Sequence, residues 1–232
     1  GHELKNSLDT ISAYSELLGQ ANESLSVDQI STHLMKAVGR MKNLIKEMFD
    51  LARLQSDSVQ LNKTEFDIAP IIGRVAARNT VLAMAKQQKL FLDIGSNIKV
   101  KADEARIEEI ADNLINNAIK YSPHTEKIVI HSSTDSKRVK VCVQDFGVGI
   151  PKEKQEKVFE QFFRVSGDTQ HTFPGLGLGL FISAEIIKRQ KGRIWVESSV
   201  GKGSKFCFSL PIRKRAMHQQ KNDLVEDSVQ QE

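Results

Sequence analysis

The sequence of 232 residues is short of several residue types, and each shortage excludes a class of protein. It has two cysteines, Cys142 and Cys207, both within alternating apolar runs. We expect them to be small core residues of a protein in a reducing compartment, because so few cysteines cannot form a disulfide framework. No apolar run approaches the roughly 20 residues that span a bilayer. With 40% hydrophobic and 27% charged residues, the composition is that of a globular protein with a sizeable core.

Charged residues of one sign are not clustered in the sequence either. The formal net charge is +4, and basic residues alternate with acidic ones along the chain. This pattern argues against nucleic acid as the main partner. A cytoplasmic location is therefore expected, with membrane attachment, if any, only through segments upstream of residue 1. We expect such segments because the first motif, at His2, would lie partway along a helix.

Residues 1–57 have the pattern of two helices. A heptad seam in the second predicts a helical hairpin, with Ser26 or Asp28 as its N-cap. An earlier stripe, with Ser15 in one core slot, predicts the first helix. One hairpin cannot bury two apolar stripes, so we expect a homodimeric four-helix bundle. Packing against the rest of the chain is the alternative. The seam consists of Ile30, Leu34, Ala37, Met41, Leu44, Met48 and Leu51, and the earlier stripe of Leu4, Leu8, Ile11 and Leu18.

After a linker at 58–62, the pattern over 63–212 becomes mixed, and residues 213–232 read as a polar tail, disordered or a linker. Helices and strands in these proportions predict an α+β fold, a two-layer sandwich with helices on one face of a mixed sheet. Asp103 is expected to cap the central helix. The expected helices are 68–86, 103–121 and 178–190, and the expected strands are 61–66, 90–94, 98–101, 128–132, 139–144, 193–197 and 205–210.

The helix predicted before Tyr121 carries an unusual set of polar residues. Asn113, Asn117, Lys120 and Tyr121 fall on neighbouring ridges because they are spaced by three and four. An amide oxygen suits Mg²⁺, which keeps waters and phosphate oxygens as its other ligands, so Asn117 is the candidate metal ligand. Lys120 can neutralise phosphate charge, and Tyr121 offers a ring to adenine. A polar helix face directed to solvent is the alternative, although asparagine is a poor helix former.

Three glycine motifs follow in order. Asp145 comes directly after a predicted strand, and its carboxylate can accept a hydrogen bond from the amine of adenine. Glycines at 147 and 149 allow the backbone close to the ring. The next motif leads into a helix, which directs free N–H groups at phosphates. It consists of Gly175, Leu176, Gly177, Leu178 and Gly179, and the last motif is Gly201-Lys202-Gly203-Ser204.

Between Glu160 and Pro174 the chain loses its periodicity, beside the predicted phosphate site. This segment is typical of a mobile lid. Arg164 within it can bring charge to the γ-phosphate during transfer, or it can be an ordinary surface arginine.

These motifs, together with His2-Glu3-Leu4-Lys5-Asn6, resemble the catalytic core of a class I sensor histidine kinase. Such a core is a dimerisation and phosphoacceptor hairpin followed by a Bergerat-type ATP-binding domain. The match runs from His2 to Pro211. By position, the resemblance implies that His2 is the phosphoacceptor, Asn117 the Mg²⁺ ligand and Asp145 the adenine reader. Gly147, Gly149, Ser204 and the glycines at 175–179 then become nucleotide contacts and lid hinges.

The acceptor motif departs from the family at one position. The family usually has proline after Asn6, where this chain has Ser7, so the helix is expected to be straighter. How this affects the balance of kinase and phosphatase activity stays open. Asn6 matches the residue that helps to orient water for the phosphatase reaction. Glu3 matches the family's base, although adjacent helix residues do not face each other well.

The resemblance implies a protein-histidine kinase that uses ATP and Mg²⁺. It would phosphorylate His2 and then an aspartate on a response-regulator receiver domain. ATP-hydrolysing relatives of this fold have a glutamate one turn before the metal-binding asparagine, and here that position is Asn113, which cannot act as a base. A GHKL-type ATPase and a non-catalytic dimeric scaffold with a degenerate nucleotide site are the alternatives.

Overall fold

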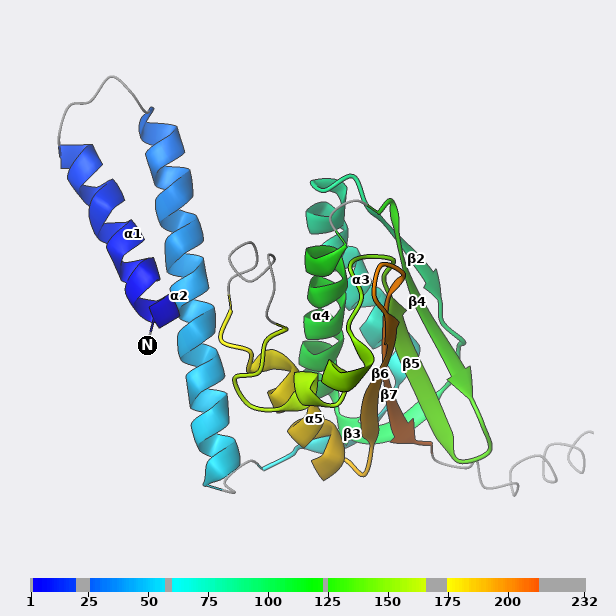
Figure 1. The fold of residues 1–232 in the computed structure, drawn as a ribbon. Helices are drawn as coiled ribbons and strands as arrows, with labels where there is room; N and C mark the ends of the chain where they lie inside the picture. The colour runs from blue at the N-terminus through cyan, green and yellow to red at the C-terminus, as the bar shows by residue number, and fades with distance from the viewer. Residues whose placement is uncertain (1, 20–25, 57–59, 123–124, 166–174, 213–232) are drawn as a thin grey trace, which may run out of the picture.

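The computed structural model describes residues 2–19, 26–56, 60–122, 125–165 and 175–212. Two long helices, α1 (His2–Gly19) and α2 (Val27–Gln55), form a hairpin beside a mixed body of helices and strands (Figure 1). Ser26, one of the two N-caps that the sequence allows, caps α2. Its hydroxyl accepts from the backbone N–H of Gln29, whose side chain accepts from the backbone N–H of Ser26, a capping box.

The hairpin buries only part of the predicted seam. Ile30, Ala37 and Leu44 are buried, but Met48 is exposed. On α1, Leu8 and Leu18 were predicted to be core residues and are exposed by 49% and 46% in the single chain. Leu4 and Ile11 of the predicted stripe are half-buried, and Ser7 is buried. Tyr14 is also half-buried, and its ring stacks on His33 of α2 at 4.9 Å.

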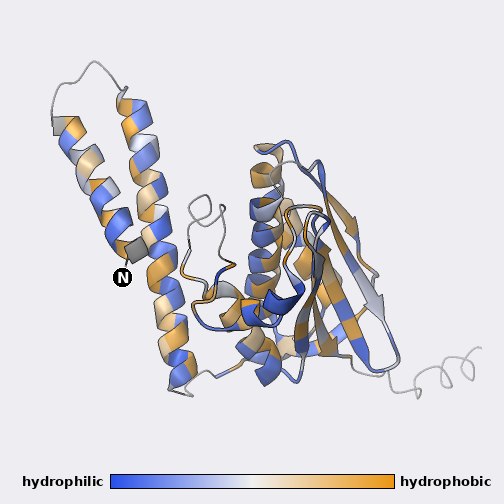
Figure 2. Ribbon diagram, viewed as in Figure 1, coloured by the Kyte–Doolittle hydropathy of each residue, from blue (hydrophilic) through white to orange (hydrophobic). Residues whose placement is uncertain are grey.

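A second apolar stripe on α2 is not covered. Met35, Val38, Ile45 and Phe49 follow heptad spacing, and each is at least 42% exposed. Figure 2 shows apolar residues around both hairpin helices. The hairpin therefore has more apolar surface than one pair of helices can bury.

The body is a two-layer α+β sandwich, as predicted. A five-stranded sheet has the order β2-β4-β5-β7-β6, in which β2 and β4 are parallel and the other pairs antiparallel. A separate ladder pairs β1 with β3. Helices α3, α4 and α5 cover one face (Figure 1). The strands are β1 (Lys63–Asp67), β2 (Lys89–Asp93), β3 (Lys99–Asp103), β4 (Lys127–Thr134), β5 (Arg138–Gln144), β6 (Arg193–Ser199) and β7 (Gly203–Pro211). The helices are α3 (Ile68–Met84), α4 (Glu104–Tyr121) and α5 (Gly179–Arg189), with two 3₁₀ turns, η1 (Lys152–Lys154) and η2 (Lys157–Phe159).

The core lies between the sheet and its helices. Alternate residues of β5 and β7 point inward, where β5 meets α4 and β7 meets α5, as period-two strands facing one helical layer require. Asp103 caps α4 by accepting from the N–H of Arg106, as predicted. The innermost residues include Ile107, Ile110, Leu114, Val139, Val141, Phe206 and Phe208, all at most 6% exposed.

The two cysteines are buried, as predicted, but they are not independent core residues. Cys142 on β5 lies directly opposite Cys207 on β7, and the two form a disulfide. This bond was not predicted, because composition does not reveal that two cysteines 65 residues apart lie on paired strands.

Helix α2 packs onto the body beside α4 and α5. Leu54 belongs to the same core cluster as the body. Asp50 accepts from Arg106 at 3.2 Å, and Lys46 donates to Glu109. Burial raises the pKa of Glu109, but the hydrogen bonds from Lys46 and Arg106 outweigh burial and lower it overall. The hairpin thus contacts the body through both apolar and charged groups. Within the described residues, none of the helices has the length and apolar character that a membrane crossing needs.

Candidate nucleotide-binding site

A cavity of about 410 Å³ opens where α4, the ends of β5 and β7, and the start of α5 meet. Most of the predicted site residues line it, although they come from five separate stretches of sequence. Those on the cavity wall are Asn113, Asn117, Lys120, Tyr121, Asp145, Gly149, Arg164, Gly175, Leu176, Gly177, Gly179 and Ser204.

The two asparagines of α4 hold each other in place. Asn113 donates to the hydroxyl of Ser183 on α5 at 3.0 Å, and its own oxygen accepts from Asn117 at 3.4 Å. Because Asn117 uses its nitrogen in this bond, its oxygen is the atom offered to a ligand. Asn116, between them, turns away and donates to Asp112 at 3.0 Å. The alternative of a wholly solvent-directed polar face is therefore wrong.

The site suits a divalent cation held mainly by a ligand. Asn117 supplies a neutral oxygen, and the described residues contain no cluster of three or more His, Cys, Asp and Glu side chains that could hold a metal. Mg²⁺ is typically bound by one or two protein groups together with phosphates and water. Asn117 thus fits Mg²⁺ that arrives with a phosphorylated ligand.

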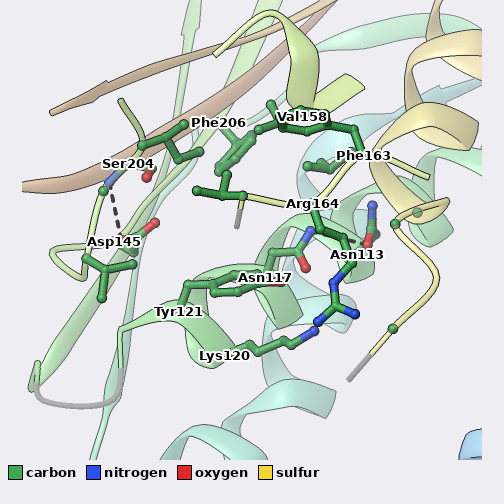
Figure 3. Close-up of a pocket in the computed structure, with 18 of the residues that line it drawn as sticks. Asn113, Asn117, Lys120, Tyr121, Asp145, Val158, Phe163, Arg164, Ser204 and Phe206 are labelled. Carbon is green, nitrogen blue, oxygen red and sulfur yellow. Dashed lines mark hydrogen bonds between the residues drawn. The ribbon is translucent and has the colours of Figure 1, made fainter. Parts of the chain in front are cut away.

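Asp145 is fixed at the opposite side of the cavity from Lys120 (Figure 3). It is only 3% exposed, and its Oδ1 accepts from the backbone N–H of Gly147 at 2.9 Å and of Ser204 at 3.2 Å. Burial raises the pKa of Asp145, and these backbone hydrogen bonds offset the rise only in part. The carboxylate is oriented through one oxygen, and the other can accept from a base amine.

Close backbone approach explains two of the glycines. A Cβ at position 147 would overlap the carbonyl oxygen of Tyr121, at the C-terminus of α4. A Cβ at Gly179 would lie 2.7 Å from the side-chain oxygen of Asn113. The glycines therefore bring the turn after β5 and the start of α5 against α4.

Two of the residues predicted to contact nucleotide do not line the cavity. Gly147 is not on the cavity wall and acts through this packing. Leu178 immediately precedes α5 and is fully buried in the core, so it supports the loop from beneath.

The two ends of the cavity differ in polarity. Figure 3 shows Arg164, from the segment after η2, and Lys120, from α4, extending toward the same side. The ring of Tyr121 lies between this charged end and Asp145. Burial raises the pKa of Tyr121, and the charge of Arg164 partly opposes the rise. A ligand with a planar base at Asp145 and phosphates at Lys120 would match the different polarity of the two ends of the cavity.

Sequence reasoning missed the apolar part of the wall. Ile150, Pro151, Val158, Leu180, Val200 and Phe206 line the cavity, and with them Val148 of the Asp145 motif and Phe163 and Val165 of the predicted lid segment, for which no apolar contact was predicted. Their only sequence signal is proximity to the glycine motifs. It also missed Glu47 of α2, which lines the cavity although it belongs to no motif.

The acceptor motif lies at the start of α1. His2 is the first residue of α1, which continues unbroken through Ser7 to Gly19. Asn6 is exposed, and its carbonyl accepts from the hydroxyl of Thr10 at 2.7 Å. The side chains of His2 and Glu3 lie outside the described part of the structure. So do residues 166–174, most of the predicted lid.

This fold and cavity define a nucleotide-binding domain of the α+β sandwich class. Residues 102–214 match the family described as histidine kinase-, DNA gyrase B-, and HSP90-like ATPase. The sensor-like histidine kinase SenX3 of Mycobacterium tuberculosis is 32% identical over 218 residues, which are 94% of this chain and 53% of that protein.

Among solved structures, the chain is similar to those of a histidine kinase. The catalytic domain of histidine kinase ThkA is 31% identical, with a TM-score of 0.57 over 65% of this chain and 97% of that domain. ThkA in complex with the response regulator protein TrrA is 26% identical, with a TM-score of 0.71 over 92% of this chain and 60% of that chain. The chain belongs to the sensor histidine kinase family. It spans about half the length of the curated relative SenX3.

Proposed function

We propose that the chain is the core of a protein-histidine kinase that transfers the γ-phosphoryl group of ATP to His2. The observation that carries the proposal is the cavity, in which Asp145 and Ser204 suit adenine and Asn117 and Lys120 suit a metal–phosphate group. An amide at Asn113 supports transfer over hydrolysis, because no carboxylate is available there to activate water.

In the proposed reaction, a ring nitrogen of His2 attacks the γ-phosphorus in line. A P–N bond forms, the bond between the γ-phosphorus and the oxygen bridging to the β-phosphate breaks, and ADP leaves. The imidazole proton passes to Glu3 or to water. Mg²⁺, when bound through Asn117, would neutralise phosphate charge. Lys120 and Arg164 would hold the remaining negative charge as the group transfers, since this chemistry depends mainly on positioning and electrostatics.

The proposed partners are a second copy of the chain and a response-regulator receiver domain. The uncovered stripe of Met35, Val38, Ile45 and Phe49 supports a homodimeric four-helix bundle. The complex of the relative ThkA with a response regulator supports transfer of the phosphoryl group to a receiver aspartate. We further propose that residues 1–57 and 63–212 act as separate domains of the cytoplasmic portion of a sensor kinase, and that Asn6 serves its phosphatase reaction.

The test is labelling with γ-labelled ATP. We expect acid-labile, alkali-stable label on the wild type and none on His2→Ala. His33→Ala removes another imidazole from the same hairpin and should keep the label. Label persisting on His2→Ala would refute the assignment, and sustained phosphate release without labelled protein would indicate an ATPase instead.

A further inference from the structure

Glu47 lies at the nucleotide cavity although it belongs to the hairpin. It lines this cavity and also an adjoining one of about 490 Å³ between α2 and α4. Its Oε2 is shielded from solvent and has no hydrogen-bond partner among the described residues. A buried carboxylate oxygen without a donor is costly, so the docked position of α2 leaves one charged group poorly satisfied.

The positive charge that most affects Glu47 is that of Lys120, at the charged end of the nucleotide cavity. Burial raises the pKa of Glu47, and the positive charge of Lys120, followed by that of Lys46, opposes the rise. The negative charge of Asp50 raises it further. Lys120 lines both cavities, as Glu47 does. Phosphates bound at Lys120 would therefore meet a buried carboxylate of the same sign.

Other contacts hold α2 on the body from outside the nucleotide cavity. Asp50 and Arg106 are paired at 3.2 Å, with side chains 11% and 21% exposed. Arg189 donates to the backbone carbonyl of Leu54 at 3.1 Å, and Lys46 pairs with Glu109. Docking of α2 is thus fixed by groups separate from the one that enters the cavity.

We propose that Glu47 couples nucleotide binding to hairpin docking, because its carboxylate and the phosphates of ATP compete for Lys120. ATP in the cavity places negative charge beside Glu47 in surroundings of low dielectric, and moving α2 away from α4 relieves the repulsion. By linkage, docking of α2 weakens ATP binding by the same factor. The proposal rests on the proposed function in that it takes ATP as the ligand of this cavity.

Calorimetric titration of the whole chain with a non-hydrolysable ATP analogue tests the coupling. Glu47→Gln keeps the shape of the side chain and removes its charge, so analogue binding should tighten at least about fivefold. Binding of adenosine, which has no phosphate, should stay unchanged. Asp9→Asn changes the net charge equally at an exposed position of α1 and should behave as wild type. Equal or weaker analogue binding by Glu47→Gln would overturn the proposal, and weaker binding would indicate that Glu47 helps to hold the cation.

Hydrogen exchange of residues 40–55 provides the second measurement. In the wild type, the analogue should speed exchange there as α2 leaves the body, and in Glu47→Gln it should cause much less change. No change in the wild type at saturating analogue would overturn the proposal. Neither experiment needs phosphoryl transfer, so the outcomes are separable. A wild type that binds no analogue would refute the proposed function as well, whereas equal affinities with labelling intact would refute the coupling alone.

Discussion

The hairpin and the body solve the same packing problem to different extents. The body places its apolar side chains between a five-stranded sheet and three helices, with Leu114 and Phe208 fully buried. The hairpin leaves Met35, Ile45 and Phe49 at least 42% exposed. The body can therefore fold as a unit, whereas the stability of the hairpin depends on a second surface.

The largest effect is expected from a substitution that leaves a void in the apolar core of the body. Leu114→Ala should reduce the free energy of unfolding of the body by about 3 kcal/mol, because a fully buried side chain is lost beneath the sheet. Urea denaturation would measure it. Leu92→Ala, at a position 46% exposed, is the matched control and should cost far less. Equal losses in the two variants would contradict the assignment of the core.

The next effect concerns the uncovered stripe of the hairpin. Ile45→Glu should weaken self-association at least about a hundredfold, because it places a charge on each side of a symmetric apolar contact. Analytical ultracentrifugation would follow the dimer. ATP binding by the body should remain, in contrast to the Leu114 variant. An unchanged dimer would mean that another surface joins the two copies.

At the site, Asp145→Asn should weaken ATP binding by about 10- to 100-fold, because a charged acceptor and its backbone contacts are altered. Burial raises the pKa of Asp145, and the adenine contact that we propose for it would favour the ionised carboxylate. As the pH is lowered, the affinity of the wild type for ATP should therefore begin to fall at a pH above the pKa of an ordinary aspartate. The affinity of the asparagine variant should not follow this pH dependence. The same acid dependence in both proteins would assign it to another group.

The smallest effect is expected at the contact between the two regions. Glu109→Gln should cost about 1 kcal/mol or less, because the ion pair with Lys46 is partly exposed. The folded-state pKa of Glu109 is lowered from 4.5, so its contribution is complete at neutral pH. It is lost as the pH falls below 4.5 toward the folded value. Thermal unfolding of wild type and variant from pH 7 to pH 3 should converge, and a constant difference would contradict this.

The order of motifs was enough to predict the α+β fold and most of the cavity wall. Local rules succeeded where one residue decides a boundary, as with the cap Asp103, and they narrowed the cap of α2 to Ser26 or Asp28. They failed where the outcome depends on contacts distant in sequence. Leu8 and Leu18 carry the same periodic signal as the buried stripe, and only the actual packing separates the two faces. Glu47 has no local signal because its role arises where α2 meets the body.

The disulfide has a consequence for how the site tolerates change in chain length. Cys142 lies three residues before Asp145, and Cys207 lies three residues after Ser204, on paired strands of fixed register. The disulfide thus joins two strand segments of equal length, here called arms, one leading to Asp145 and the other to Ser204 at the cavity. Deleting one residue from either arm would leave the other arm in place, so the two ends would no longer meet, and the side chains beyond the deletion would turn to the opposite face of the sheet.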